Sequence, residues 1–181
     1  MKLLPTAIPD VMVLVPRVFE DDRGYFFESY NQRTFQELGL HWNFAQDNQS
    51  HSRRNVVRGL HYQVEQPQGK LVRAVSGAIW DVAVDLRRSS PHFGKWVAEE
   101  LSAANGSMLW IPPGFAHGFL VLSDSADVLY KATDFYAPAH ERTIRWDDPD
   151  LAIAWPGKAS EMILSAKDRD GHFFSRSDVF A

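Results

Sequence analysis

His61 and Asp168 are the residue types in this sequence that could together remove a proton from carbon. His61 stands in residues 58–63 (RGLHYQ), which are typical of a buried strand with aromatic neighbours, and Asp168 follows Lys167 far downstream. A histidine oriented by a carboxylate is a general base, and a nearby lysine can hold an anion. Nothing near them suggests a serine or cysteine nucleophile. We therefore expect the base to act directly on a substrate proton.

Each of these residues also has a purely structural interpretation. A lone histidine on a strand is more often a satisfied structural residue, and Asp168 and Lys167 taken singly are ordinary surface charges. Gly59 favours a function for His61, because glycine within a strand marks a bulge or a close ligand approach. Arg58 and His61 would face opposite sides of a regular strand. A bulge is therefore needed for both to enter one site.

Three further side chains could act on a bound ligand. Lys70 opens a predicted strand, where it either blunts an exposed edge or directs a cation at an enolate oxygen or a phosphate. Tyr130 shares a strand face with Val128 and Ala132, so it is either a core aromatic or a phenol that donates a proton. Tyr136 follows at the end of that strand, where an aromatic ring could stack on a nucleobase.

Residues 112–119 (PPGFAHGF) resemble the second sequence box of cupins, Pro-x-Gly-x-x-His, with His117 in the histidine position. In a metal cupin this histidine joins ligands from a first His-x-His box. Here the matching stretch is His61-Tyr62-Gln63, so the second histidine of that box is missing. Two histidines without a third ligand make a poor transition-metal site. We expect His117 to contact a ligand or to close a polar network.

Composition narrows the class of protein. The 181 residues are 45% hydrophobic and 13% aromatic, which predicts one folded globular domain over residues 1–181. The absence of cysteine excludes disulfides and thiolate metal sites. A net charge of −4 argues against non-specific binding of nucleic acid. Because Pro5 interrupts the N-terminal apolar segment and no long apolar run follows, we expect no signal peptide, no membrane association and a cytoplasmic location.

Short apolar segments separated by glycine, proline and other turn residues predict a mainly β fold, either a sandwich, a jelly roll or a barrel. The predicted strands cover residues 11–15, 25–30, 70–76, 78–86, 96–101, 108–111, 118–122 and 127–133. A helix is predicted near 32–38, with Asn31 as N-cap and Gly39 after its end. Weaker helix signals occur near 147–153 and 158–162, and residues 169–181 suggest an irregular arm.

From about Asp21 to Asp168 the chain resembles the dTDP-4-dehydrorhamnose 3,5-epimerase family of nucleotide-sugar enzymes. Each motif alone is weak, but all of them occur together and in order. The motifs are Asp22–Glu28 (DRGYFFE), Gln46–Ser50 (QDNQS), Arg58–Gln63 (RGLHYQ), Gln68–Arg73 (QGKLVR), Asp81–Asp85 (DVAVD), Ser89–Pro91 (SSP), Phe93–Trp96 (FGKW), Trp110–Pro112 (WIP), Gly114–Phe119 (GFAHGF), Tyr130-Lys131, Asp147–Pro149 (DDP), Trp155-Pro156 and Ser165–Asp168 (SAKD).

The resemblance implies a cupin-type β jelly roll (a double-stranded β-helix) with a few short helices and no metal or organic cofactor. It also implies a homodimer whose N-terminal strands cross to the partner. The implied substrate is dTDP-4-dehydro-6-deoxy-D-glucose, which would be inverted at C3 and C5 to dTDP-4-dehydro-β-L-rhamnose in dTDP-L-rhamnose biosynthesis. The resemblance does not decide whether the product is used for a surface polysaccharide or for a secondary metabolite.

The resemblance also implies roles for individual residues. His61 would be the base, Asp168 its orienting partner, and Tyr130 the acid on the other face of the sugar. Lys70 would stabilise the enolate at O4 and contact the substrate. The other residues that match substrate-binding positions are Arg23, Glu28, Gln46, Asp47, Asn48, Arg58, His117, Glu141 and Lys167, together with Tyr136, which matches the residue stacked on thymine. Arg23 and Glu28 would complete the partner's site.

Three alternatives stay open at this point. A mono-epimerase that acts at C3 or C5 alone shares the fold and most motifs, although Tyr130 favours the double epimerase. The second alternative is a metal-dependent cupin, such as a dioxygenase or isomerase. Metal analysis of the purified protein would distinguish it from an epimerase of this family. A non-catalytic sugar-nucleotide-binding jelly roll predicts affinity for the ligand without proton exchange.

Overall fold

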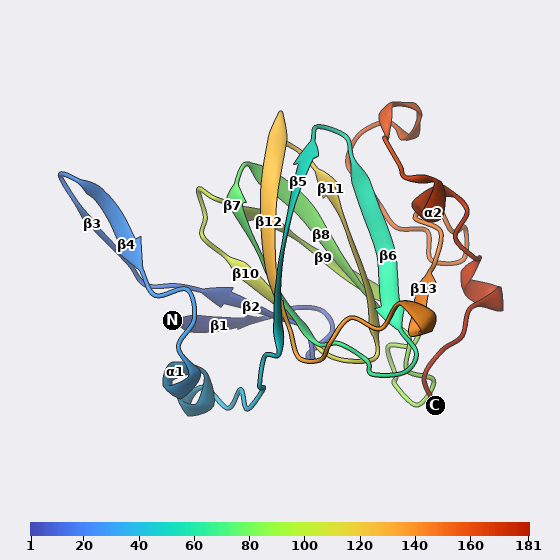
Figure 1. Cartoon of the computed structure of the whole chain (residues 1–181), viewed down its shortest axis with the longest axis horizontal. Coiled ribbons are helices and arrows are strands. Elements are labelled where there is room, and N and C mark those ends of the chain that lie inside the picture. Colours follow the sequence, from blue (N-terminus) through green and yellow to red (C-terminus); the bar gives the residue numbers. More distant parts are fainter.

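The computed structural model describes all 181 residues and contains two antiparallel sheets with a hairpin that projects from them (Figure 1). The first sheet contains, in spatial order, β1 (Lys2–Pro5), β2 (Met12–Val15), β10 (Met108–Ile111), β7 (Lys70–Ser76), β12 (Ser125–Ala132) and β5 (Gln46–Arg53). The second contains β13 (Glu141–Thr143), β6 (Val57–Gln63), β11 (Phe115–Val121), β8 (Ala78–Asp85) and β9 (Trp96–Ser102). From β5 to β12 the chain passes repeatedly from one sheet to the other, so the predicted mainly β fold is confirmed as a jelly roll.

The main core fills the space between the two sheets. Val72 of β7, Ala83 of β8 and Phe119 of β11 are buried there, as the period of two in a strand requires. The same period turns Val82 to the other face of the second sheet, where a separate apolar cluster forms. Asp81 precedes Val82 in the sequence, lies on the same face of β8 as Ala83 and is fully buried. It is one of the few polar side chains inside the jelly roll.

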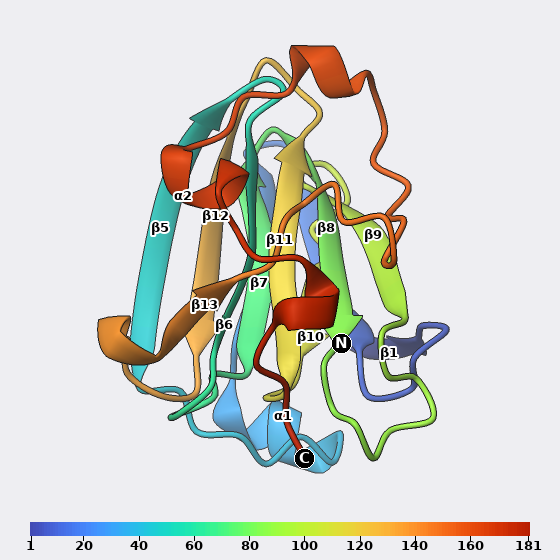
Figure 2. The ribbon, with the colours of Figure 1, turned by 90° about the vertical axis from the view of Figure 1, so that its right-hand side faces the viewer.

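Residues 144–181 cover the outer face of the second sheet, as Figure 2 shows in orange and red. This segment contains α2 (Ala166–Arg169) and two single 3₁₀ turns, η2 (Ala159–Glu161) and η3 (Phe174–Arg176). Isolated bridges Val56–Ile163 and Ile144–His172 hold the segment on either side of α2. Residues 169–181 are irregular, as predicted, but they lie against the sheet, where the Tyr62 hydroxyl donates to the carbonyl of Asp178 at 2.6 Å. The segment therefore has a fixed path past β6.

Local signals explain the helices and the errors in predicting them. Asn31 caps α1 (Gln32–Glu37), which confirms the predicted helix, and a 3₁₀ turn, η1 (Pro138–His140), precedes β13. No helix forms at 147–153, because the Asp148 carboxylate accepts from the N–H groups of Asp150 and Leu151 and holds a turn instead. The weak signal at 158–162 is only η2. No helix of the structure is long and apolar enough to cross a membrane.

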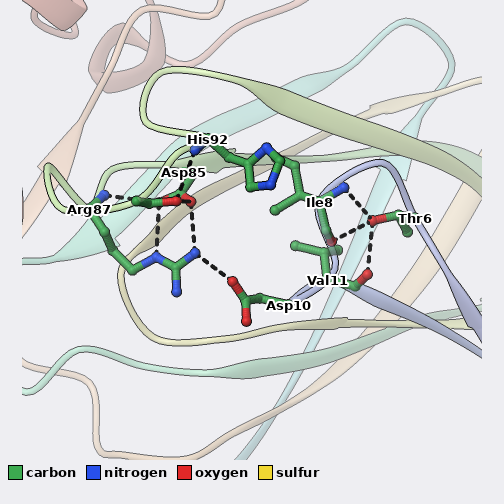
Figure 3. A network of polar contacts seen from close by, with 8 residues as sticks. Thr6, Ile8, Asp10, Val11, Asp85, Arg87 and His92 are labelled. Carbon is green, nitrogen blue, oxygen red and sulfur yellow. Dashed lines mark hydrogen bonds and ion pairs between the residues drawn. The ribbon is translucent and has the colours of Figure 1, made fainter.

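A network of polar contacts ties the N-terminal loop to the end of β8 (Figure 3). Arg87 donates through Nε and Nη2 to both oxygens of Asp85, at 2.9 and 2.7 Å, and through Nη2 to Asp10 at 2.8 Å. Burial opposes the charge of Asp85, but the hydrogen bonds from Arg87 and Ser90 hold its pKa below the ordinary value. A bidentate arginine pair therefore compensates this buried carboxylate.

The hairpin of β3 (Val18–Asp21) and β4 (Gly24–Phe27) projects away from both sheets (Figure 1). Its apolar side chains are largely in solvent: Phe19, Tyr25 and Phe26 are 51%, 64% and 70% exposed. A two-stranded hairpin with no further packing is at best marginally stable in water. Exposed aromatic residues on such a hairpin mark it as an interaction surface.

Candidate active site

A cavity of about 710 Å³, its mouth included, lies between strands of the two sheets. Strands β6, β11 and β13 of the second sheet form one side, and β5, β7 and β12 of the first sheet form the other. The residues that line the cavity are Ser50, Arg58, His61, Tyr62, Gln63, Gln68, Lys70, His117, Phe119, Tyr130, Tyr136 and Glu141. Most of the residues that line it are polar.

A bulge in β6 brings Arg58 and His61 into this one cavity. His117 of β11 pairs with His61, and Phe119 pairs with Arg58, so two steps on β11 correspond to three on β6. This confirms the bulge that the spacing required. Gly59 makes it possible with a φ of +120°, and a Cβ there would lie 2.5 Å from the Cα of Gly118. Only glycine fits so close to the neighbouring backbone.

His61 and Asp168 form a hydrogen-bonded pair, with Nε2 of the ring 2.5 Å from Oδ1 of the carboxylate. Asp168 is buried at the start of α2, where Oδ2 also accepts from the hydroxyl of Ser165 at 2.8 Å. Burial opposes its charge, but the hydrogen bonds from His61 and Ser165 hold its pKa below the ordinary value. The carboxylate therefore accepts the Nε2 proton, which leaves Nδ1 of His61 as the free basic nitrogen.

Lys70 places a cation at the buried end of the cavity. It is only 8% exposed, and its Nζ donates to the carbonyl oxygen of His61 at 3.3 Å. Burial lowers its pKa to about 8, although the carboxylates of Asp81 and Glu141 raise it. At neutral pH the ammonium form predominates in a site of low dielectric, where it can stabilise a developing negative charge strongly.

Tyr130 lines the cavity from β12, in the first sheet, whereas His61 belongs to the second sheet. Burial raises the pKa of its phenol, so the hydroxyl keeps its proton at neutral pH and can donate it. His61 and Tyr130 thus approach the cavity from opposite walls. A flat or ring-shaped ligand between them could lose a proton on one face and gain a proton on the other.

The rim of the cavity carries an exposed aromatic ring and an ion pair. The Tyr136 hydroxyl donates to Oε2 of Glu141 at 2.9 Å, and Nζ of Lys167 lies 2.5 Å from the same oxygen. The Tyr136 N–H donates to the side chain of Gln46, whose amide in turn donates to Asn48 at 2.9 Å. The ring of Tyr136 is held from two sides while its face stays in solvent.

The sequence as a whole was compared with known proteins. A model of the family described as dTDP-4-dehydrorhamnose 3,5-epimerase matches residues 5–176. The chain belongs to this family of isomerases. It is 60% identical over 181 residues to the dTDP-4-dehydrorhamnose 3,5-epimerase of Pseudomonas aeruginosa, covering 99% of both chains.

Solved structures agree with the assignment to the dTDP-4-dehydrorhamnose 3,5-epimerase family. The dTDP-6-deoxy-D-glucose-3,5-epimerase of Legionella pneumophila, in complex with dTDP-4-keto-L-rhamnose, superposes with a TM-score of 0.94 at 46% identity and covers 98% of this chain and 94% of its own. A 3′-monoepimerase of Streptomyces bikiniensis in complex with dTDP-quinovose has a TM-score of 0.88 at 33% identity, with coverage of 94% and 87%. The chain is thus more similar to a 3,5-epimerase than to this mono-epimerase.

Six of the residues that match binding positions of the epimerase family do not line the cavity of their own chain. Gln46, Asn48 and Lys167 lie at its rim, next to Tyr136 and Glu141. The other three lie away from it. Asp47 points away from it, and its carboxylate pairs with Lys131 at 3.0 Å, because it alternates with Gln46 and Asn48 along β5. Glu28 accepts from the side chains next to α1. Arg23 lies on the projecting hairpin with its side chain 89% exposed, bonded only to Asp21.

The structure also adds residues that the sequence interpretation left out of the site. Ser50, Gln63 and Gln68 line the cavity, and the Ser50 hydroxyl is buried without a hydrogen-bond partner. Asp81 lies behind the cavity, where Oδ1 accepts from Nε2 of His117 at 2.8 Å. The signal in the sequence that could have identified Asp81 is the predicted strand 78–86, in which two carboxylates occur among apolar residues on one face. No group of three or more side chains that could hold a metal ion occurs in the structure.

Proposed function

We propose that the enzyme inverts C3 and C5 of dTDP-4-dehydro-6-deoxy-D-glucose and produces dTDP-4-dehydro-β-L-rhamnose. The observation that carries this proposal is the pairing of His61 with Asp168 on one wall of a cavity whose other wall presents Tyr130. Membership in the 3,5-epimerase family and the ligands of the solved relatives support the same substrate class. No step of the proposed reaction needs a metal or an organic cofactor.

The proposed chemistry follows from the position of the ketone. C3 and C5 both flank C4, so loss of a proton from either carbon gives an enolate with its negative charge on O4. Nδ1 of His61 takes the proton, and Asp168 stabilises the imidazolium that results. The ammonium of Lys70 binds O4 more strongly as charge develops there, which lowers the barrier rather than only tightening binding.

Inversion requires that the new proton arrive on the opposite face of the sugar ring. Tyr130 meets this requirement, because it lies on the sheet opposite His61 and its phenol is protonated. After each inversion the imidazolium of His61 releases its proton to solvent and the tyrosinate regains one from solvent, so the pair is reset before it acts again. The same pair serves C3 and C5 in turn, since both carbons are adjacent to the one ketone.

The nucleotide part of the substrate would bind at the rim. Arg58, whose Nε donates to Ser52 at 2.9 Å, and Lys167 supply positive charge for the diphosphate. Lys167 would exchange its contact with Glu141 for a phosphate oxygen. The exposed face of Tyr136 would stack on thymine, and Gln46 and Asn48 would hydrogen-bond the nucleoside, as the family resemblance implies.

The enzyme would act as a homodimer in which the β3–β4 hairpin of one chain covers the site of the other. Exposed aromatic residues on the hairpin support an exchange of this kind, since more than half of each side chain remains exposed in its own chain. Arg23 and Glu28 would then contribute to the partner's site rather than to their own. We place the enzyme in the cytoplasm, because its proposed substrate is a nucleotide sugar and the chain has no cysteine.

Proton NMR of dTDP-4-dehydro-6-deoxyglucose incubated with the enzyme in deuterated water tests the proposal. We expect deuterium at both C3 and C5 and a product that a 4-keto reductase converts to dTDP-L-rhamnose. Exchange at one carbon only would assign a mono-epimerase, the second candidate, whose fold and many of whose residues the chain shares with the Streptomyces bikiniensis enzyme. Binding without exchange at either carbon would contradict both.

A further inference from the structure

Asp81 is a buried carboxylate next to the cavity that the proposed mechanism does not use. It has no exposed surface, and its Oδ1 accepts the Nε2 proton of His117 at 2.8 Å. Its Oδ2 is buried as well and has no hydrogen-bond partner. Since an uncompensated buried carboxylate is costly, its presence calls for a nearby positive charge.

Histidine does not supply that charge. Burial lowers the pKa of His117, and although the carboxylate of Asp81 raises it, the net shift is downward. His117 is therefore neutral at physiological pH, with its proton on Nε2 and none on Nδ1. No lysine or arginine forms an ion pair with Asp81 within 4 Å. The positive charge that compensates the Asp81 carboxylate must therefore lie farther away.

Lys70 is the buried cation that lines the same cavity as His117, the hydrogen-bond partner of Asp81. The structure gives its Nζ a single weak hydrogen bond, to the carbonyl of His61 at 3.3 Å, and among the charges that favour its ammonium form Asp81 has the largest effect. Glu141 has a smaller effect. Its carboxylate also contacts Lys167 and accepts from Tyr136. The charged and titratable groups around Lys70 are Asp81 on β8, His117 on β11, His61 and Arg58 on β6, Tyr130 on β12, Glu141 on β13 and Lys167 on α2.

We propose that Asp81 is a positioning residue that keeps Lys70 in the ammonium form and holds His117 in one tautomer. It touches no reacting atom and acts through these two side chains. The inference rests on the proposed function, because it matters for catalysis only if Lys70 stabilises the enolate. Lys70 could lose much of its charge in this buried site without the carboxylate, and the enolate would then lose its counter-charge.

The test compares the pH profile of turnover for the wild type, Asp81→Asn and a matched control, Asp85→Asn. Asp85 lies on the same strand and is equally buried, but Arg87 compensates its charge. For Asp81→Asn we expect the alkaline loss of kcat to begin about one pH unit lower, with kcat at pH 8 reduced about fivefold and KM little changed. For Asp85→Asn we expect lower stability and an alkaline limb in the wild-type position. A folded Asp81→Asn protein with an unshifted alkaline limb overturns the proposal.

A second measurement keeps the test independent of the reaction. The titration of Lys70 is followed by NMR in protein labelled with ¹³C at the lysine ε-carbons, with the signal assigned through Lys70→Arg. We expect it to titrate at lower pH in Asp81→Asn than in the wild type, and an equal midpoint overturns the proposal. If the wild type exchanges no substrate proton, the proposed function fails while this titration still decides the role of Asp81.

A third variant covers the case in which Asp81→Asn does not fold. Removing both charges together, in Asp81→Asn with Lys70→Met, leaves no unbalanced buried ion. We expect this double variant to fold, with a circular dichroism spectrum like that of the wild type. If it also fails to fold, Asp81 supports the structure through its hydrogen bond to His117 alone, and the proposal is overturned.

Discussion

Nε2 of His61 on β6 and Oδ1 of Asp168 on α2 lie 2.5 Å apart, although 107 residues separate them in the chain. Two bridges create this contact. Val56 pairs with Ile163 just before α2, and Ile144 pairs with His172 just after it. The covering segment 144–181 is thereby held to the second sheet on both sides of the aspartate. These two bridges therefore fix the position of the Asp168 carboxylate next to His61.

Replacing Asp168 with asparagine should lower kcat by a factor on the order of 10²–10⁴. The amide keeps the shape of the side chain but no longer stabilises the imidazolium that forms on His61. Turnover of the dTDP-4-keto sugar is the measurement. Asp127→Asn is the matched control, because Asp127 makes a similar contact with His51 at 3.1 Å on the surface. Equal activities for the two variants would contradict the assignment.

Replacing Tyr130 with phenylalanine should reduce epimerised product by a factor of about 10² or more, because the proton donor on the opposite wall is lost. Deuterium exchange at the acidic carbons should fall less, since His61 still removes and returns protons on its own face. Tyr30→Phe is the control, as that ring packs against Phe35 and Phe44 away from the cavity. Normal turnover by Tyr130→Phe would remove it from the mechanism.

Gly59→Ala should destabilise the protein by about 2 kcal/mol or more, measured by urea unfolding. The new methyl group would lie 2.5 Å from the Cα of Gly118 and 2.7 Å from the carbonyl oxygen of His117, both backbone atoms that cannot move independently. Gly157→Ala separates the clash from the backbone strain, because Gly157 has a φ of +98° but no atom within 4 Å of its Cβ position. Similar losses in both would mean that backbone strain alone matters.

The buried Lys70 ammonium should make stability depend on pH in the alkaline range. Its pKa is about 8 in the folded protein, where burial lowers it from the ordinary value of 10.5. Between these values the unfolded chain binds more protons than the folded one, so the free energy of unfolding rises with pH. Relative to Lys70→Met, the wild type should gain up to about 3 kcal/mol from pH 8 to 10.5, measured by urea unfolding. A constant difference between the two proteins would show that the ammonium is not destabilised by burial.

Exchange of the β3–β4 hairpin can be tested by mixing two inactive variants. Arg23→Ala lacks a residue that the hairpin would donate, and His61→Asn lacks the base. Co-expressed together, they should recover up to about one quarter of wild-type activity, because about half of the dimers are mixed and each mixed dimer has one intact site. His61→Asn mixed with Tyr130→Phe should stay inactive, since both residues belong to one chain's site. Failure of the first mixture would argue that each site is built from a single chain.

Much of the fold could be predicted from the sequence, because its signals are local. Alternating apolar residues marked β8 and β12, and Asn31 marked the start of α1. The strand β5 was missed because its segment, QDNQSHSR, contains no apolar residue. Its inward side chains, such as Ser50, face a polar cavity rather than the core, so the usual alternation of hydrophobicity never appears. The turn at Asp148 was mistaken for the start of a weak helix, because aspartate is favoured both at the N-cap of a helix and in turns.

The sequence by itself determined the family, the main strands and the residue types of the site, since motifs and periodicity are properties of neighbouring residues. Only the tertiary structure decided which of those residues meet. It placed Asp168 on His61, set Tyr130 on the opposite wall, turned Asp47 outward and put Asp81 behind His117. Contacts of this kind depend on the register of strands and on the path of the covering segment. Many distant packing interactions set these together, and no local pattern of residues encodes them.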